Sequence, residues 1–143
     1  TPLVERYRSR VSGPLLDRID LHVEVPALRL RDLRGTGAEA SSAIAARVAA
    51  ARELQRSRFP AEHPTPTNAS LDARRLRHEC ALDESGRRLL ESAFERLGLS
   101  ARALSRVLKV ARTIADLGGA EAIAPAHVAE AIQYRSLDRR LAA

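Results

Sequence analysis

Residues 100–117 read SARALSRVLKVARTIADL, and this stretch decides the fold. Its apolar residues recur every three or four positions, which is the spacing of one face of an amphipathic α-helix. Ser100 is placed to cap the start of this helix, and Gly118 and Gly119 are placed to end it. The predicted inward face consists of Leu104, Val107, Leu108, Ala111, Ile114 and Ala115.

The segments around this helix predict further helices that can cover its apolar face. We expect them at residues 38–58, with Ile44, Val48 and Ala51 inward, at 71–80, at 83–97 with Asp83 as N-cap, and from Pro125 onward. Residues 60–68 contain Pro64 and Pro66 and cannot continue a helix. Several amphipathic helices with short connections predict a mainly α fold, a helical bundle.

One segment differs from this helical pattern. From Ile19 to Val25, apolar residues alternate with polar ones until Pro26, which is typical of a half-buried β-strand. A lone strand cannot satisfy its own ladder hydrogen bonds, so we expect partner strands in sequence that precedes Thr1. The chain begins with Thr1 rather than Met, so we expect it to be part of a longer protein. Residues 26–37 are basic and irregular, and we interpret them as a hinge.

Composition limits the possible classes of protein. At 143 residues the chain has the size of one domain. A net charge of +6 and a sequence pI near 10.8 leave two interpretations open, a polyanionic partner or a solvated amphipathic surface. Cys80 is the only cysteine, which argues against a disulfide framework and a thiolate zinc site and favours the cytosol. The sequence contains neither an apolar run of the roughly 20 residues that cross a bilayer nor a signal peptide at its start.

The sequence lacks several common motifs of catalytic sites. It has no phosphate-binding loop of the form G-x-x-x-x-G-K-[ST], since Lys109 lies on an apolar helix. Nucleophile-elbow and metalloprotease motifs are missing too, and the four histidines do not have the spacing of metal ligands. We therefore do not expect this chain alone to hydrolyse ATP.

Arg18 is the first of two arginines in unusual settings. Gly13 and Pro14 predict a turn, and Leu15 and Leu16 can anchor it, so that Arg18 stands where the chain enters the predicted strand. A guanidinium held rigidly at such an edge suits the spread charge of a phosphoryl-transfer transition state. The alternative is a simple ion pair with Asp17 or Asp20.

Arg102 is the second, at the second position of the helix that Ser100 caps. The helix dipole disfavours a cation at this end by several tenths of a kcal/mol. An anion shared by the helix N-terminus and the guanidinium would explain the placement. The alternative is a surface arginine with an acidic residue nearby.

Five stretches of the chain together resemble one family. They are residues 7–26 (YRSRVSGPLLDRIDLHVEVP), 99–103 (LSARA), 108–117 (LKVARTIADL), 130–135 (EAIQYR) and 137–139 (LDR). Together they are similar to the C-terminal end of the ComM/YifB family of magnesium-chelatase-like AAA+ ATPases. The first stretch is the longest and the most specific.

The resemblance implies an organisation and two site residues. Residues 1–36 would end the AAA+ core, with the arginine-finger segment and the hinge, and residues 37–143 would form the C-terminal helical lid. Arg18 would be an arginine finger that acts in trans on a neighbouring subunit's ATP. Arg102 would be the sensor-2 residue, which contacts the phosphates of the nucleotide.

The resemblance also implies the setting in which these residues act. The full-length protein would use ATP and Mg²⁺, form a homo-oligomeric, hexameric ring in the cytoplasm, and drive branch migration of DNA during natural transformation and recombination. The chain departs from the family pattern because Walker A, Walker B and sensor-1 segments are missing, and we expect them upstream. This chain alone should bind no nucleotide tightly.

Two alternatives remain open. One is the motor subunit of a magnesium chelatase in tetrapyrrole synthesis. The other is a non-catalytic basic helical domain that binds DNA phosphates through a stripe of Arg102, Arg106 and Lys109.

Overall fold

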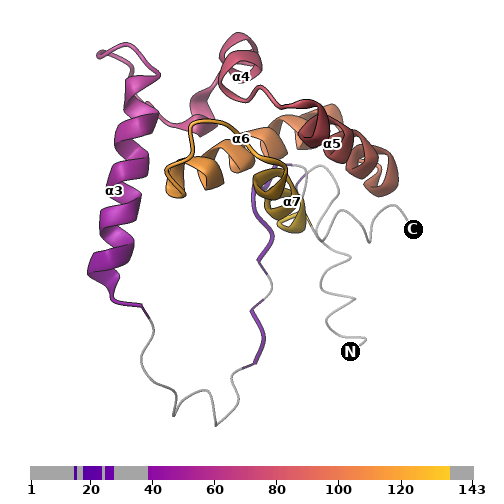
Figure 1. The fold of residues 1–143 in the computed structure, drawn as a ribbon, viewed down its shortest axis with the longest axis horizontal. Helices are drawn as coiled ribbons and strands as arrows, with labels where there is room; N and C mark the ends of the chain where they lie inside the picture. Colours follow the sequence, from indigo (N-terminus) through magenta and orange to yellow (C-terminus); the bar gives the residue numbers. More distant parts are fainter. Residues whose placement is uncertain (1–14, 16–17, 24, 28–38, 136–143) are drawn as a thin grey trace.

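The computed structural model describes residues 15, 18–23, 25–27 and 39–135, and these form a helical bundle (Figure 1). The mainly α fold class predicted from the sequence is confirmed. The hinge and the LDR stretch at 137–139 fall wholly or mostly outside the described residues. The elements are α3 (Ser41–Ser57), the 3₁₀ turn η2 (Asn68–Ser70), α4 (Ala73–Glu79), α5 (Glu84–Leu97), α6 (Ala101–Leu117) and α7 (Pro125–Gln133).

Helix α6 is the centre of the bundle. It packs against α3, α4, η2 and α7, while α5 packs against α7. Val107, Ala111 and Ala115 of α6 are buried in the core, as the apolar stripe predicts, and Val128 and Ala131 of α7 are buried with them. An isolated parallel β-bridge between Leu82 and Ile123 ties together the loops that precede α5 and α7.

The two helix starts predicted at Asp83 and Ser100 are found where these caps placed them. The Asp83 side chain accepts a hydrogen bond of 2.7 Å from the Gly86 N–H, and Ser100 Oγ accepts one of 3.1 Å from the Ala103 N–H. Gly98 ends α5 in the left-handed conformation, with φ of 59°, which favours glycine because a side chain is strained there. No helix among the described residues is both long and apolar enough to cross a membrane.

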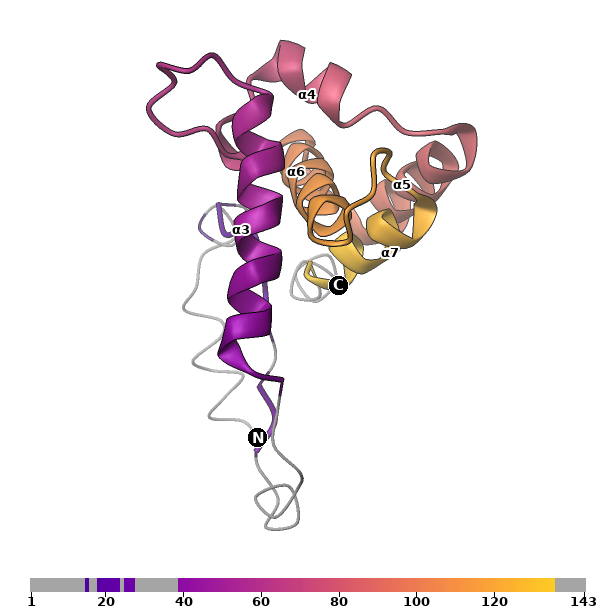
Figure 2. The same ribbon diagram turned by 60° about the vertical axis from the view of Figure 1, so that its left-hand side comes forward.

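The inward face predicted for the first helix is only partly correct. Ala51 of α3 is buried, but Ile44 and Val48 are each 43% exposed. Figure 2 shows the reason, because α3 meets the bundle through its C-terminal part while its N-terminal part extends beyond the other helices. The periodic pattern identified the face correctly, but it carries no information on how far the neighbouring helices reach.

The strand predicted for residues 19–25 is not formed in the described part of that segment. Residues 19, 21–23 and 25–27 have no regular secondary structure, and none of them has a ladder partner among the described residues. Burial is also the reverse of the predicted pattern, since His22 is buried while Val23 and Val25 are 66% and 84% exposed. Alternation specifies two faces, but a strand forms only where another strand supplies its hydrogen bonds.

A buried polar network around Asp116 holds the helices of the bundle in register. The Asp116 side chain is 0% exposed and accepts hydrogen bonds of 2.7 and 2.6 Å from the Arg58 guanidinium. It also accepts one of 2.8 Å from the Asn68 amide and one of 3.0 Å from Arg112 Nε. These bonds with Asp116 raise the pKa of Arg58 above its already high usual value. The carboxylate therefore joins the end of α3, η2 and α6.

The same guanidinium groups extend the network to two more elements. Arg112 donates hydrogen bonds to the carbonyl oxygens of Ala120 and Glu121, at 2.6 and 2.8 Å, which fixes the loop that leaves α6. Arg58 Nε lies 3.3 Å from a carboxylate oxygen of Glu79, at the end of α4. Both arginines thus have acceptors beyond Asp116.

We predict that Asp116→Asn destabilises the chain by about 3–5 kcal/mol, because two largely buried guanidinium groups lose their shared charge partner. The free energy of unfolding, measured by chemical denaturation, checks this. Glu84→Gln is the matched control, because Glu84 pairs with Arg88 on the surface, where side chains are 67% and 75% exposed. That control should cost under about 1 kcal/mol. Equal effects of the two substitutions would contradict the assigned role of the network.

A second prediction concerns pH. Burial raises the pKa of the Cys80 thiol from 9.0 to about 11. Between these values the unfolded chain has lost the thiol proton while the folded chain keeps it, so stability falls as pH rises from 9 to 11. Below pH 9 both states are protonated and the thiol has no influence. Unfolding measured across this range should show a steeper loss in the native chain than in Cys80→Ala, and parallel curves would contradict the prediction.

Candidate functional site

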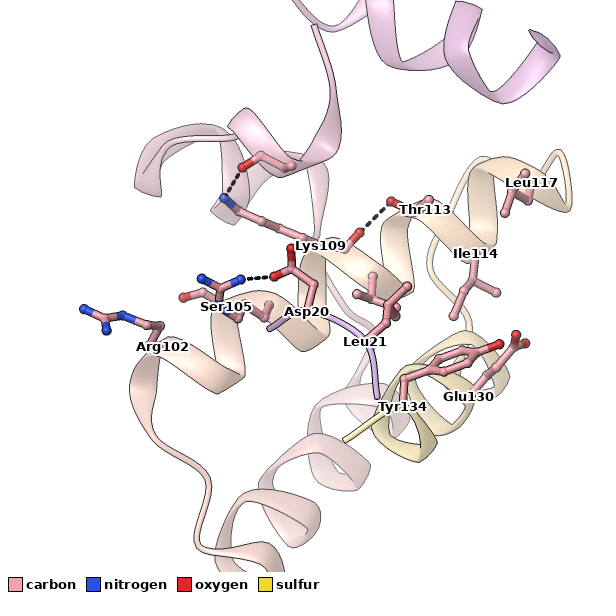
Figure 3. Close-up of a pocket in the computed structure, with 13 residues that line it drawn as sticks. Asp20, Leu21, Arg102, Ser105, Lys109, Thr113, Ile114, Leu117, Glu130 and Tyr134 are labelled. Carbon is pink, nitrogen blue, oxygen red and sulfur yellow. Dashed lines mark hydrogen bonds and ion pairs between the residues drawn. The ribbon is translucent and has the colours of Figure 1, made fainter. Parts of the chain in front are cut away.

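A pocket of about 460 Å³ lies along one face of α6 (Figure 3). Asp20 and Leu21 close one side of it, Glu130 and Tyr134 from the end of α7 close another, and Ala69 of η2 contributes at its edge. The remaining lining residues come from α6 itself. The pocket therefore exists only because residues distant in sequence converge on this helix.

The two ends of the pocket differ in chemistry. Toward the N-terminal end of α6 lie Arg102, Ser105, Arg106 and Lys109, whose spacing places them on one helix face. Toward the C-terminal end lie apolar side chains together with the Tyr134 ring. The apolar lining consists of Leu21, Val110, Ile114 and Leu117. Such a pocket suits an anion or an anionic group attached to a less polar body.

Arg102 lies at the polar end, exposed at the second position of α6. Its side chain extends away from the other labelled residues in Figure 3. No hydrogen bond or ion pair links it to another described residue, so the surface ion pair considered from the sequence does not form within this part of the chain. The guanidinium stands beside the positive end of the α6 dipole, where an anion would meet both.

Arg18 is exposed and does not line the pocket. Its backbone N–H donates a hydrogen bond of 3.0 Å to the Leu15 carbonyl oxygen, which forms a turn directly before the segment at residue 19. The turn predicted at Gly13 and Pro14 lies outside the described residues. The ion pair with Asp20 considered from the sequence does not form, because the Asp20 carboxylate accepts a hydrogen bond from Arg106 instead. Asp17, the other partner considered, is outside the described residues.

The two candidate arginines thus do not form one cluster. Arg102 is among the residues that line the pocket at its edge, whereas Arg18 does not line it and only its neighbours Asp20 and Leu21 do. This separation is compatible with two guanidinium groups that serve different phosphates.

The segment that carries Arg18 is nevertheless attached to the bundle. The His22 backbone N–H donates a hydrogen bond of 2.8 Å to the Tyr134 carbonyl oxygen. The Arg135 side chain, in a residue only 1% exposed, donates one to the Ile19 carbonyl oxygen. The pattern of residues in the sequence did not indicate these contacts, because backbone acceptors leave no signature in it.

The basic stripe proposed from the sequence is largely used inside the chain. Arg106 is bound to Asp20, and Lys109 Nζ donates a hydrogen bond of 2.7 Å to the Ala69 carbonyl oxygen. Of its three cations, only Arg102 lacks a partner among the described residues. This favours one phosphate contact over a continuous surface for a DNA backbone.

The donor set of the pocket fits a phosphate better than a metal ion. Arg102 offers a guanidinium that has no partner among the described residues, whereas the Ser105 and Thr113 hydroxyl groups already donate to the carbonyl oxygens of Ala101 and Lys109. The described residues contain no group of three or more His, Cys, Asp or Glu side chains that could hold a metal ion.

Comparison with known proteins gives two family matches. Residues 38–135 match the family model described as magnesium chelatase, subunit ChlI C-terminal, and residues 2–33 match the model described as magnesium chelatase, subunit ChlI. The first match covers all of the helices from α3 to α7, and the second includes Arg18.

Curated relatives give the same result. The chain is 42% identical over 140 residues to the competence protein ComM of Haemophilus influenzae, a match that covers 96% of this chain and 26% of that protein. It is 43% identical over 138 residues to the uncharacterized protein YifB of Escherichia coli, covering 95% of this chain and 26% of that protein. The chain thus spans about a quarter of the length of these relatives. It belongs to the ComM/YifB family of magnesium-chelatase-like AAA+ proteins.

Proposed function

We propose that this chain is the finger-and-lid part of an ATP-hydrolysing ring, in which Arg18 acts on a neighbouring subunit's ATP and Arg102 contacts the phosphates of its own subunit's nucleotide. The observation that carries the proposal is that both arginine side chains are exposed and lack hydrogen-bond or ion-pair partners among the described residues, while Arg58, Arg106 and Arg112 are engaged. The full-length protein uses ATP with Mg²⁺ and works as a homo-oligomer, with six subunits as the expected ring.

The chemistry assigned to Arg18 follows from the charge and the geometry of its guanidinium group. Charge that develops on a transferring phosphoryl group is met by a planar fork of donors that is always protonated. The turn at Leu15 and the attachment of residues 19–22 to the bundle support this role, because they hold the backbone on either side of Arg18.

The chemistry assigned to Arg102 is binding rather than bond breaking. A phosphate placed at the N-terminus of α6 interacts with the helix dipole, free backbone N–H groups and the guanidinium together. Since α6 packs against most of the bundle, a shift of its N-terminus on nucleotide binding would move the whole lid.

The substrate of the motor is proposed to be DNA, remodelled by ATP-driven branch migration during recombination. The name of the Haemophilus relative, a competence protein, and the net charge of +6 support this choice. The names of the matched family models favour a second candidate, a magnesium-chelatase motor. Stimulation of the full-length protein's ATP turnover by branched DNA supports the first candidate, and stimulation only by a chelatase partner supports the second.

Subunits with Arg18→Ala should be nearly inactive in the full-length protein, because loss of an arginine finger costs about a thousandfold or more in rate. Mixed with subunits that lack a working phosphate loop but keep Arg18, they should recover part of the ATP turnover. Some mixed rings then pair an intact ATP site with an intact finger.

Arg18→Lys is the matched variant and should rescue poorly, because a point charge on a flexible stem lacks the fork of donors. If the two mutants assemble into common rings and mixing still restores no turnover, the action in trans is wrong.

Arg102→Ala should lower ATP turnover and weaken nucleotide binding in the full-length protein while the melting temperature of the 143-residue chain stays the same. The side chain is exposed and makes no hydrogen bond or ion pair with other described residues, so the fold should not depend on it. Steady-state kinetics and thermal unfolding check the two halves of this prediction. A large drop in melting temperature would show that Arg102 is structural.

A further inference from the structure

Three contacts fasten the segment after Arg18 to the two helices that form the pocket. Arg106 of α6 binds the Asp20 carboxylate, Arg135 binds the Ile19 carbonyl oxygen, and the His22 N–H binds the Tyr134 carbonyl oxygen at 2.8 Å. The last two contacts use the main chain of the segment and so do not depend on its side chains. The Asp20–Arg106 ion pair joins two side chains that both line the pocket.

This ion pair connects the surroundings of the two candidate site residues. Asp20 is two residues after Arg18, and Arg106 is one helical turn after Arg102 on the same face of α6. A movement of the N-terminal part of α6 would therefore be passed through Arg106 and Asp20 to the backbone that presents Arg18.

We propose that the Asp20–Arg106 ion pair positions the Arg18 guanidinium and couples it to the helix that carries Arg102. The inference rests on the proposed function, in which Arg102 meets its own subunit's nucleotide and Arg18 meets a neighbour's. Asp20 and Arg106 are positioning residues, because neither is assigned a contact with the reacting phosphate. Through them, the state of one ATP site sets the placement of the finger at the next.

The burial of the pair suits this role. The Asp20 side chain is 54% exposed and the Arg106 side chain 23% exposed, so the ion pair contributes little to the stability of the fold. The core is held by the separate network around Asp116, which does not include either residue. Breaking the pair should thus misplace Arg18 without unfolding the bundle.

The first test uses charge reversal in the full-length protein. Asp20→Arg and Arg106→Asp should each lower kcat for ATP by about tenfold or more, since small misplacements of a catalytic group have large effects on rate. The melting temperature and the KM for ATP should change little. The double variant, in which the charges are exchanged, should recover most of the wild-type kcat. Arg88→Glu, which breaks the exposed pair with Glu84 on α5, is the control and should leave kcat unchanged.

The second test separates an effect on the neighbour's site from an effect on the subunit's own site. Arg106→Asp subunits should regain ATP turnover in rings mixed with subunits that lack the phosphate loop but keep Asp20, Arg106 and Arg18. In such rings a correctly placed finger reaches the ATP of the Arg106→Asp subunit. If Arg106 instead served its own subunit's nucleotide, mixing would restore nothing.

These outcomes distinguish the inference from the proposed function. If the charge exchange restores nothing, or if mixing restores nothing although the rings assemble, the positioning role is overturned while the role of Arg18 stands. If Arg18→Ala itself retains full turnover, the proposed function fails instead.

Discussion

The rest of the structure depends on the hydrogen bonds that the buried Asp116 carboxylate accepts. A fully buried charge is tolerated only when it is paired and hydrogen-bonded, and here Arg58, Asn68 and Arg112 meet that requirement from three separate elements. Because these donors must converge on one carboxylate, the end of α3, η2 and α6 are fixed relative to one another. The apolar contacts of Val107, Ala111 and Ala115 supply burial, while the polar network specifies the register.

The network around Asp116 also determines how the candidate site residue Arg102 is held. Helix α6 carries Asp116 near its C-terminal end and Arg102 at its N-terminal end, so the arginine is presented from an element that the network holds in place. The segment with Arg18 depends instead on an exposed ion pair and two contacts to the end of α7. In the proposed function, Arg102 is the more firmly held arginine and contacts its own subunit's nucleotide, while Arg18 is more lightly held and acts on the neighbour's.

The sequence predicted local features well and long-range pairing poorly. Asp83, Ser100 and Gly98 mark helix ends through contacts within a few residues, and the period of α6 marks its buried face. The pairing of Arg58 with Asp116 spans 58 residues, and only the i, i+4 spacing of Arg112 and Asp116 beside Ala111 and Ala115 could have indicated a buried ion pair. The proposed roles of Arg18 and Arg102 rest on the family resemblance, because the local sequence also fits a simple ion pair at Arg18 and a surface arginine at Arg102.

The most direct test of the account is a structure of the full-length ring bound to a non-hydrolysable ATP analogue, determined by electron cryomicroscopy. We predict the Arg18 guanidinium within about 3 Å of a terminal phosphate oxygen bound to the adjacent subunit. The Arg102 guanidinium should contact a phosphate of the nucleotide in its own subunit. An Arg18 that contacts its own subunit's nucleotide, or that reaches no nucleotide in an assembled ring, would contradict the account.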